Sequence, residues 1–499
     1  MRVVNPPAAE AAAAPPSPSS DQLDRSLIQG IAWTSAVKWG SQIVTWAVTL
    51  IVARILTPED YGLVGMAAIY LGLVKLLSEF GLGTAVVTLR ELSTRQVAQI
   101  NGLALLIGVG SFGLSLLAAP ALGRFFNAPQ LPFVVVVMSL AFLVTAFRIV
   151  PHALLQRELR FKLLALMEGV EALVAATSTL LLAFFGFGYW ALVLGPFLGV
   201  IVLTALTVFA RPHWFAWPRR QALTNALTFS RHALVGALSW YMYSTADHVI
   251  IGRVLGQGAL GLYAFGWTLA GVTVEKITAL VGRVTPGFFS AVQTDLAALR
   301  RYLLTLTEGI SMLTFPVALG LTLVAEDFVL LALGEKWAEM IPVLQLLAVF
   351  SAYRSITPLL VPVLNVRRET RFTMYNNLLA LLVLPPAFYV GSRWGIEGIA
   401  TTWIVMLPLI YLPLYHRVFS RIELSTGRYL RALWPALSSS LLMGAAVLAL
   451  SRTLPPGMAL ALQLGLKVAL GAAVYCLAMV VLHRERLRAF YRVLKQARG

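Results

Sequence analysis

Runs of about 20 apolar residues, separated by short polar stretches, follow one another from near residue 28 to near residue 482. A helix that crosses ~30 Å of hydrocarbon at ~1.5 Å per residue needs about 20 such residues. The pattern therefore predicts an all-α, polytopic membrane protein with fourteen transmembrane helices. The predicted spans are 28–52, 61–83, 97–120, 131–152, 163–186, 189–210, 232–252, 258–282, 302–325, 340–363, 372–392, 395–416, 432–451 and 458–482.

The composition agrees with this pattern. Of the 499 residues, 59% are hydrophobic and only 12% are charged, and the mean hydropathy is +0.80. Soluble domains carry about 25% charged residues, so the composition favours a membrane protein strongly over a soluble enzyme. Residues 1–24 are rich in Ala, Pro and Ser, which predicts a disordered tail because such a segment cannot bury apolar surface. The tail lacks the basic and then apolar pattern of a signal peptide.

The cations are distributed unevenly between the two sets of loops. The formal net charge is +17, from 39 Lys and Arg against 22 Asp and Glu. In a soluble protein this excess would suggest nucleic acid, but here 27 cations fall on one side of the predicted spans, six on the other and six within them. Cytoplasmic loops carry such an excess. We therefore expect both termini in the cytoplasm, with membrane lipids and no nucleic acid as partners.

Three short motifs of the first half return in the same order in the second half, at offsets of 199, 206 and 211 residues. This repetition predicts two related six-helix bundles, an N-lobe at 25–218 and a C-lobe at 219–421. Residues 422–499 would add helices 13 and 14 and a basic cytoplasmic tail. Both bundles begin on the same side, so the repeats are parallel. The matching motifs are Ala53-Arg54-Ile55-Leu56 with Gly252-Arg253-Val254-Leu255, Ala146-Phe147-Arg148 with Ala352-Tyr353-Arg354, and Arg157-Glu158 with Arg368-Glu369.

Polar side chains lie on one face of the first and of the seventh predicted span. Steps of three and four residues put such side chains on a single helical face. Because these spans are repeat partners, we expect the two faces to line a wet cavity between the lobes. The alternative is hydrogen bonding in a dry helix interface. The first face holds Ser35, Lys38, Gln42, Thr45 and Thr49, and the second holds Tyr241, Ser244 and His248, with Asp247 beside them.

Charged residues inside a bilayer cost at least ~2.5–3.5 kcal/mol each, so they are candidates for function. The repeat places Arg148 and Arg354 at the cytoplasmic ends of spans 4 and 10. Arginine binds phosphate oxygens in a bidentate manner, so this pair is a candidate for an anionic head group. The other interpretation is that both arginines only anchor their helices at the membrane–water interface.

The remaining charges inside the spans are mixed. Lys75 and Glu79 are spaced to neutralise each other. Glu275 and Lys276 are neighbours that point in different directions, so one of them can face a cavity. Desolvated carboxyl groups without an evident local cation are candidate proton carriers. We predict substrate binding by Lys38, Gln42, Arg148, Arg354 and Lys276, and ion coupling by Asp247, Glu275 or Glu308, while Glu168 and Glu171 also lack an evident local cation.

Signatures of enzymes are absent from the sequence. The six histidines are too scattered for metal-ligand spacing, so we expect no metal site. The glycines of Gly108 to Gly113 fit a dinucleotide-binding fingerprint but lie within an apolar span, where they indicate close helix packing. The sequence contains no phosphate-binding Gly-Lys-Ser/Thr loop. We therefore expect a transporter without a cofactor.

Four motifs resemble those of oligosaccharide flippases, the Wzx-type polysaccharide transporters of the multidrug/oligosaccharidyl-lipid/polysaccharide exporter superfamily. The resemblance implies flipping of an undecaprenyl-diphosphate-linked oligosaccharide to the periplasmic leaflet of the bacterial inner membrane. It further implies alternating access, usually coupled to an ion gradient, for lipopolysaccharide, capsule or exopolysaccharide synthesis. The motifs are ARILTPEDYG at 53–62, EFGLGTA at 79–85, FPVALG at 315–320 and LGEKW at 333–337.

Two other functions stay open. A drug/cation antiporter of the same superfamily would have a lumen dominated by acids, whereas the cations here are mixed with acids. A membrane polysaccharide polymerase or ligase tends to need a sizeable outer loop, and the predicted outer connections are short. Polysaccharide polymerase and export machinery are candidate partners of a flippase.

The predicted topology has a direct test. Alkaline phosphatase is active only outside the cytoplasm, so its fusion near Arg219 is expected to be inactive and a matched fusion near Arg253 active. Enzyme activity of both fusions is compared at equal expression. Activity of the Arg219 fusion would overturn the orientation.

Overall fold

The computed structural model describes residues 39–79, 82–88, 92–218, 236–455 and 457–486. The predicted tail at 1–24, Lys38 and most of the basic C-terminal tail lie outside the described residues. The described residues are mostly helical and contain no β-strand, which confirms the all-α class.

The chain forms a succession of long helices joined by short turns. The first part holds a helix at 39–55 and then α2 Pro58–Glu79, α3 Leu82–Thr88, α4 Thr94–Phe126, α5 Leu131–Ala146, α6 Ile149–Arg157, α7 Phe161–Phe184 and α8 Trp190–Ala210. The second part holds a helix at 236–250, η1 Ile251–Leu255, α10 Gln257–Ala291, α11 Leu296–Ala332, η2 Glu335–Met340, α12 Ile341–Ile356, η3 Thr357–Leu359, α13 Leu360–Val366, α14 Thr370–Gly391, η4 Ser392–Trp394 and α15 Gly395–Arg421. Helices α16 Thr426–Thr453 and α17 Leu460–Leu482 follow.

Many of these helices can cross a bilayer. By length and apolar composition, nine helices of the described residues qualify, or ten if the bent pair α5 and α6 is one span. Helices α14 and α15, separated by η4, count together as one of the nine. The multi-pass membrane character is thus confirmed, while the number fourteen stays a prediction.

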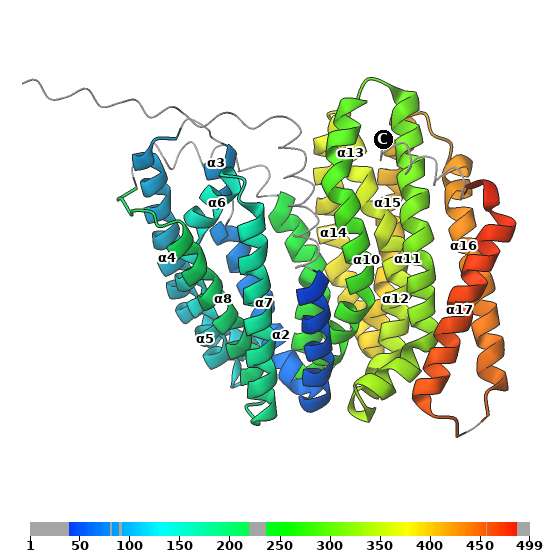
Figure 1. The fold of residues 1–499 in the computed structure, drawn as a ribbon, viewed down its shortest axis with the longest axis horizontal. Helices are drawn as coiled ribbons and strands as arrows, with labels where there is room; N and C mark the ends of the chain where they lie inside the picture. Colours follow the sequence, from blue (N-terminus) through cyan, green and yellow to red (C-terminus); the bar gives the residue numbers. More distant parts are fainter. Residues whose placement is uncertain (1–38, 80–81, 89–91, 219–235, 456, 487–499) are drawn as a thin grey trace, which may run out of the picture.

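The helices gather into two lobes and an appended pair (Figure 1). Helices α2 and α4 to α8 form one lobe, α10 to α15 form the second, and α16 and α17 pack on the outer side of α11. The predicted boundary at residue 219 falls outside the described residues, so the exact lobe limits stay a prediction. Connections at 157–161, 366–370 and 421–426 lie at one end of the molecule, which we call the basic end because of its arginines.

The lobes touch where α2 crosses α10, toward the opposite end. A Cβ built on Gly62 would lie 1.7 Å from the backbone oxygen of Gln257, and one on Gly261 would lie 1.8 Å from that of Pro58. Only glycine permits such close contact between two helix backbones. The two glycines also occupy matching places in the sequence repeat, 199 residues apart.

Hydrogen bonds between the lobes gather around the same contact. The indole Nε1 of Trp337 donates to the Ala53 backbone oxygen at 2.9 Å, and Lys336 Nζ donates to the Arg54 backbone oxygen at 2.7 Å. Further along α2, the Tyr241 hydroxyl donates to the Ile69 backbone oxygen at 2.6 Å.

In the described part of the chain, the buried apolar side chains also join the two lobes at one end of the molecule and not at the other. One apolar core includes Leu63 of α2, Leu260 of α10 and Trp337, and so joins both lobes near the opposite end. Near the basic end, the first lobe has its own core around α3, α4 and α6, and the second has another around α11, α13 and α15. Among the described residues, the lobes therefore share a core at one end only.

Replacing Gly62 by alanine should separate the lobes, because the new methyl group meets backbone that cannot move aside. Overpacking of this kind costs about 1–3 kcal/mol. We expect a lower melting temperature and less disulfide formation between cysteines introduced at Glu59 and Gly258, in a background with Cys476→Ser.

Gly110→Ala is the matched control, since nothing lies within 4 Å of a Cβ at that position of α4. If Gly62→Ala and Gly110→Ala cross-link equally well, the glycine contact does not hold the lobes together.

Candidate functional site

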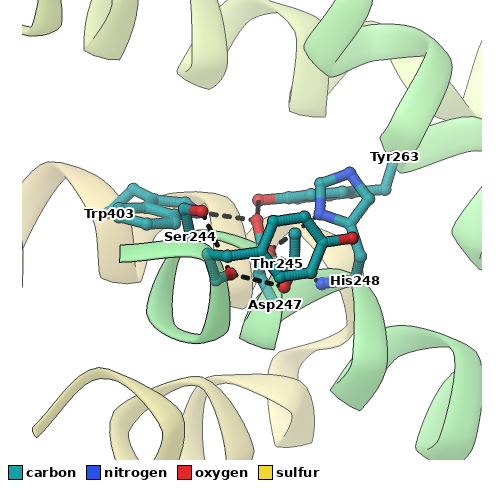
Figure 2. Close-up of polar contacts among 7 residues, drawn as sticks. Ser244, Thr245, Asp247, His248, Tyr263 and Trp403 are labelled. Carbon is teal, nitrogen blue, oxygen red and sulfur yellow. Dashed lines mark hydrogen bonds and ion pairs between the residues drawn. The ribbon is translucent and has the colours of Figure 1, made fainter. Parts of the chain in front are cut away.

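Asp247 is fully buried in the second lobe, and hydrogen bonds surround its carboxylate (Figure 2). Its Oδ2 accepts from the Tyr263 hydroxyl of α10 at 2.8 Å and from Trp403 Nε1 of α15 at 2.9 Å. Its Oδ1 accepts from the backbone N–H of His248 at 2.8 Å and faces His248 Nδ1 at the same distance. Three helices thus converge on one carboxylate.

The hydrogen-bond partners of Asp247 allow its carboxylate to stay buried. A buried carboxylate costs free energy unless it is paired and hydrogen-bonded, and here both oxygens are satisfied. The side chain of His248 is 18% exposed, whereas that of its neighbour Asp247 is fully buried. The pair therefore places an imidazole directly beside a buried carboxylate.

Aromatic rings connect this pair to a second cluster of charges. The Trp267 ring lies 5.9 Å from His248 and 5.6 Å from Trp403, centroid to centroid. The guanidinium carbon of Arg354 lies 5.1 Å from the centroid of the same Trp267 ring, a cation–π contact. One indole thus touches both the histidine and the arginine.

Arg354 also makes an ion pair. Its Nη2 donates to Glu275 Oε1 at 2.7 Å, and the two side chains are 34% and 54% exposed. Because neither side chain of this pair is buried in protein, either group is free to exchange its partner. The structure thus brings together three predicted site residues, Asp247, Glu275 and Arg354, from three separate segments.

The first lobe holds a corresponding cluster near the basic end. Arg148 lies at the 44° bend between α5 and α6. The charges of Arg148, Lys75 and His152 all act on Glu171 of α7. His152 Nε2 lies 3.9 Å from Glu168 Oε1. The cations near Glu168 and Glu171 thus come from other helices, beyond the local sequence in which none was evident.

The other predicted residues lie elsewhere. Glu308 is near Arg486, with Nη1 and Oε2 3.7 Å apart, and belongs to the side of α11 that faces α16. Gln42 is half-buried in the helix at 39–55, and Lys276 is exposed on α10. Lys38 lies outside the described residues. No group of three metal-ligating side chains occurs among the described residues.

Sequence patterns did not predict the aromatic residues that contact Asp247, His248 and Arg354. Tyr263, Trp267 and Trp403 lie in apolar segments, where an aromatic ring is ordinary core. A second omission is the buried ion pair between Lys467 Nζ of α17 and Asp327 Oδ2 of α11, which are 2.5 Å apart. The one available signal was that Asp247 and Asp327 have no evident Lys or Arg partner along their own helices.

Two helical lobes closed together at one end, with charged clusters in each, define the class of the protein as a multi-pass membrane transporter. The solved structure of the lipid II flippase MurJ in an inward closed conformation has the same fold, with a TM-score of 0.74 at 11% identity. The match covers 91% of this chain and 99% of that one.

Sequence comparison gives the family. The polysaccharide biosynthesis protein family matches residues 51–342, and the chain belongs to it. The Escherichia coli (strain K12) lipopolysaccharide biosynthesis protein WzxC is 27% identical over 403 residues, 77% of this chain and 79% of WzxC. The Rhizobium meliloti (strain 1021) succinoglycan biosynthesis transport protein ExoT is 25% identical over 489 residues, 95% and 96% of the two chains. The resemblance to Wzx-type transporters is confirmed.

The indole of Trp403 should stabilise the fold through Asp247. Trp403→Phe keeps most of the ring but leaves one carboxylate oxygen with a donor fewer, and hydrogen bonds to charged groups contribute about 1.5–3 kcal/mol. We expect a clear fall in melting temperature. Trp394→Phe is the control, because Trp394 is exposed. Equal stability of the two variants would contradict the role of the indole.

Proposed function

We propose that the protein flips an undecaprenyl-diphosphate-linked oligosaccharide from the cytoplasmic to the periplasmic leaflet of the bacterial inner membrane. The product would enter lipopolysaccharide, capsule or exopolysaccharide synthesis, where polymerase and export machinery would receive it. Membership of the polysaccharide biosynthesis family supports this proposal. So do the relatives whose names refer to lipopolysaccharide and succinoglycan.

The observation that carries the proposal is the joining of the lobes at one end only. The shared core and the glycine contact lie at the end opposite the arginines. Cytoplasmic ends of membrane proteins are the basic ones, so the lobes are closed toward the periplasm in this conformation. Flipping then requires the contact at Gly62 and Gly261 to open while the basic ends of the two lobes approach each other.

The two arginines of the repeat are suited to the diphosphate. Arg354 is held by Glu275, and Arg148 lies near Glu171, so each lobe presents an arginine already beside a carboxylate. A diphosphate offers more negative charge than one carboxylate and binds guanidinium in a bidentate manner, so it can displace the glutamate. Substrate bound by both lobes would draw them together. Lys38, Gln42 and Lys276 are proposed as further substrate contacts.

Ion coupling is proposed at the acidic groups of the second lobe. A proton taken up by Glu275 would release Arg354 for the substrate, since the ion pair needs an ionised carboxylate. The Asp247–His248 pair is a second place for the ion, and Trp267 links it to Arg354. Glu308 is a third candidate, although it lies beside Arg486 on the other side of α11.

The diphosphate assignment is tested by complementation of a flippase-deficient strain. Lys38→Ala, Arg148→Ala and Arg354→Ala should each lower polymer output at least tenfold at normal membrane levels, because a charged hydrogen bond to phosphate is lost. Arg354→Lys should restore output only in part, since lysine keeps the charge but loses the bidentate geometry.

Arg393→Ala is the matched control, because Arg393 lies in η4 at the opposite end. If all three alanine variants retain full polymer output, these residues do not bind the diphosphate.

A further inference from the structure

A pocket of about 450 Å³ opens at the basic end of the molecule, between α11, the start of α16 and the residues after α17. Positions 297, 300, 301, 304, 305 and 308 of α11 line it, and their spacing places them on a single helical face. None of the residues of the Asp247 and Arg354 clusters contributes to it. The charged groups in its lining are Arg300, Arg301, Arg428, Arg486 and Glu308.

The lining is strongly positive. Four arginines surround one glutamate, and Arg486 lies 3.7 Å from that Glu308. No carboxylate of the described residues lies within ion-pair distance of Arg301 or Arg428. Burial, together with the charge of Arg486, lowers the pKa of the neighbouring His483, so that ring adds no charge at neutral pH. Arginine keeps its charge at every physiological pH.

Two arginines are held in place by their surroundings. Arg300 Nη1 donates to the backbone oxygen of Glu423 at 3.1 Å and also lies 3.4 Å from Glu423 Oε2. The guanidinium carbon of Arg301 lies 5.3 Å from the centroid of the Tyr302 ring. Glu308 is only 16% exposed, and its Oε1 has no hydrogen-bond partner among the described residues. The arginine side of the pocket is therefore partly preorganised for an oxyanion, whereas the Glu308 carboxylate would repel one.

The position of the pocket indicates where its ligand comes from. It lies near the ends of α11, α16 and α17 at the basic end, where lipid head groups are expected if these helices span the bilayer. Below it, the outer faces of α16 and α17 are apolar and exposed, as expected for contact with acyl chains. Basic pockets between helices on the cytoplasmic side are suited to phosphate-bearing head groups. We propose that this arginine pocket binds the phosphate of a lipid head group in the leaflet at the basic end.

Such a lipid would brace the appended pair of helices. Toward the opposite end, the buried pair of Lys467 and Asp327 ties α17 to α11. At the basic end, a phosphate shared by the arginines of α11, α16 and the residues after α17 would supply the second tie. The same chemistry fits a bulk phospholipid or the diphosphate of a lipid-linked substrate.

Native mass spectrometry of the purified protein tests the proposal. The wild type should retain phosphatidylglycerol or cardiolipin in preference to phosphatidylcholine, and Arg301→Gln and Arg428→Gln should each lower retention roughly fivefold. Arg431→Gln is the control, because Arg431 is exposed on the same helix one turn away and is outside the lining. Inorganic pyrophosphate added to the wild type should displace the lipid, and this arm needs no variant.

The arms separate the possible results. Preference for phosphatidylglycerol or cardiolipin assigns the pocket to bulk lipid, and preference for undecaprenyl diphosphate assigns it to substrate. Equal retention of phosphatidylcholine by the wild type, or equal loss in Arg431→Gln and Arg428→Gln, would overturn the proposal. The measurement involves no transport, so its outcome is independent of the proposed flippase function.

Discussion

Helices α2 and α10 meet backbone to backbone at Gly62 and Gly261, and the arrangement of the lobes depends on this contact. A Cβ at Gly62 or Gly261 would lie 1.7 or 1.8 Å from a carbonyl oxygen of the other helix, far inside van der Waals contact. Because the contact is made by backbone, it brings the indole of Trp337 to the Ala53 carbonyl and allows one apolar core to form across both lobes. The matching positions of the glycines explain why the contact is nearly symmetric.

Burying charge in the second lobe imposes the next constraint. Asp247 is kept in a dry interior by donors from three helices, so those helices must hold fixed positions relative to one another. The exposed pair of Arg354 and Glu275 is the opposite case, because its partners can change. Trp267 contacts both groups, so a rigid charge and an exchangeable one lie on either side of a single ring. This combination suits a site that must bind and release an anion.

The appended helices α16 and α17 are attached to the second lobe through α11. Their outer surface is apolar and exposed, while their inner faces pack on α11 through apolar residues and make particular polar contacts with it. Lys467 and Asp327 form one such contact across 140 residues of chain. The arginine pocket lies at the other end of the same helices. Apolar packing and charge thus both attach this pair to α11.

The sequence by itself determined the helical class and the multi-pass character, because hydropathy and segment length are local properties of the chain. It also predicted the repeat and the paired arginines Arg148 and Arg354 from internal similarity. Only the tertiary structure decided which charges meet. Trp403 donates to Asp247 across 156 residues, and Arg354 meets Glu275 across 79, neither at a spacing that one helix can encode. A carboxylate that looks unpaired along its own helix can find its cation on another, since helix packing brings together segments that the chain keeps far apart.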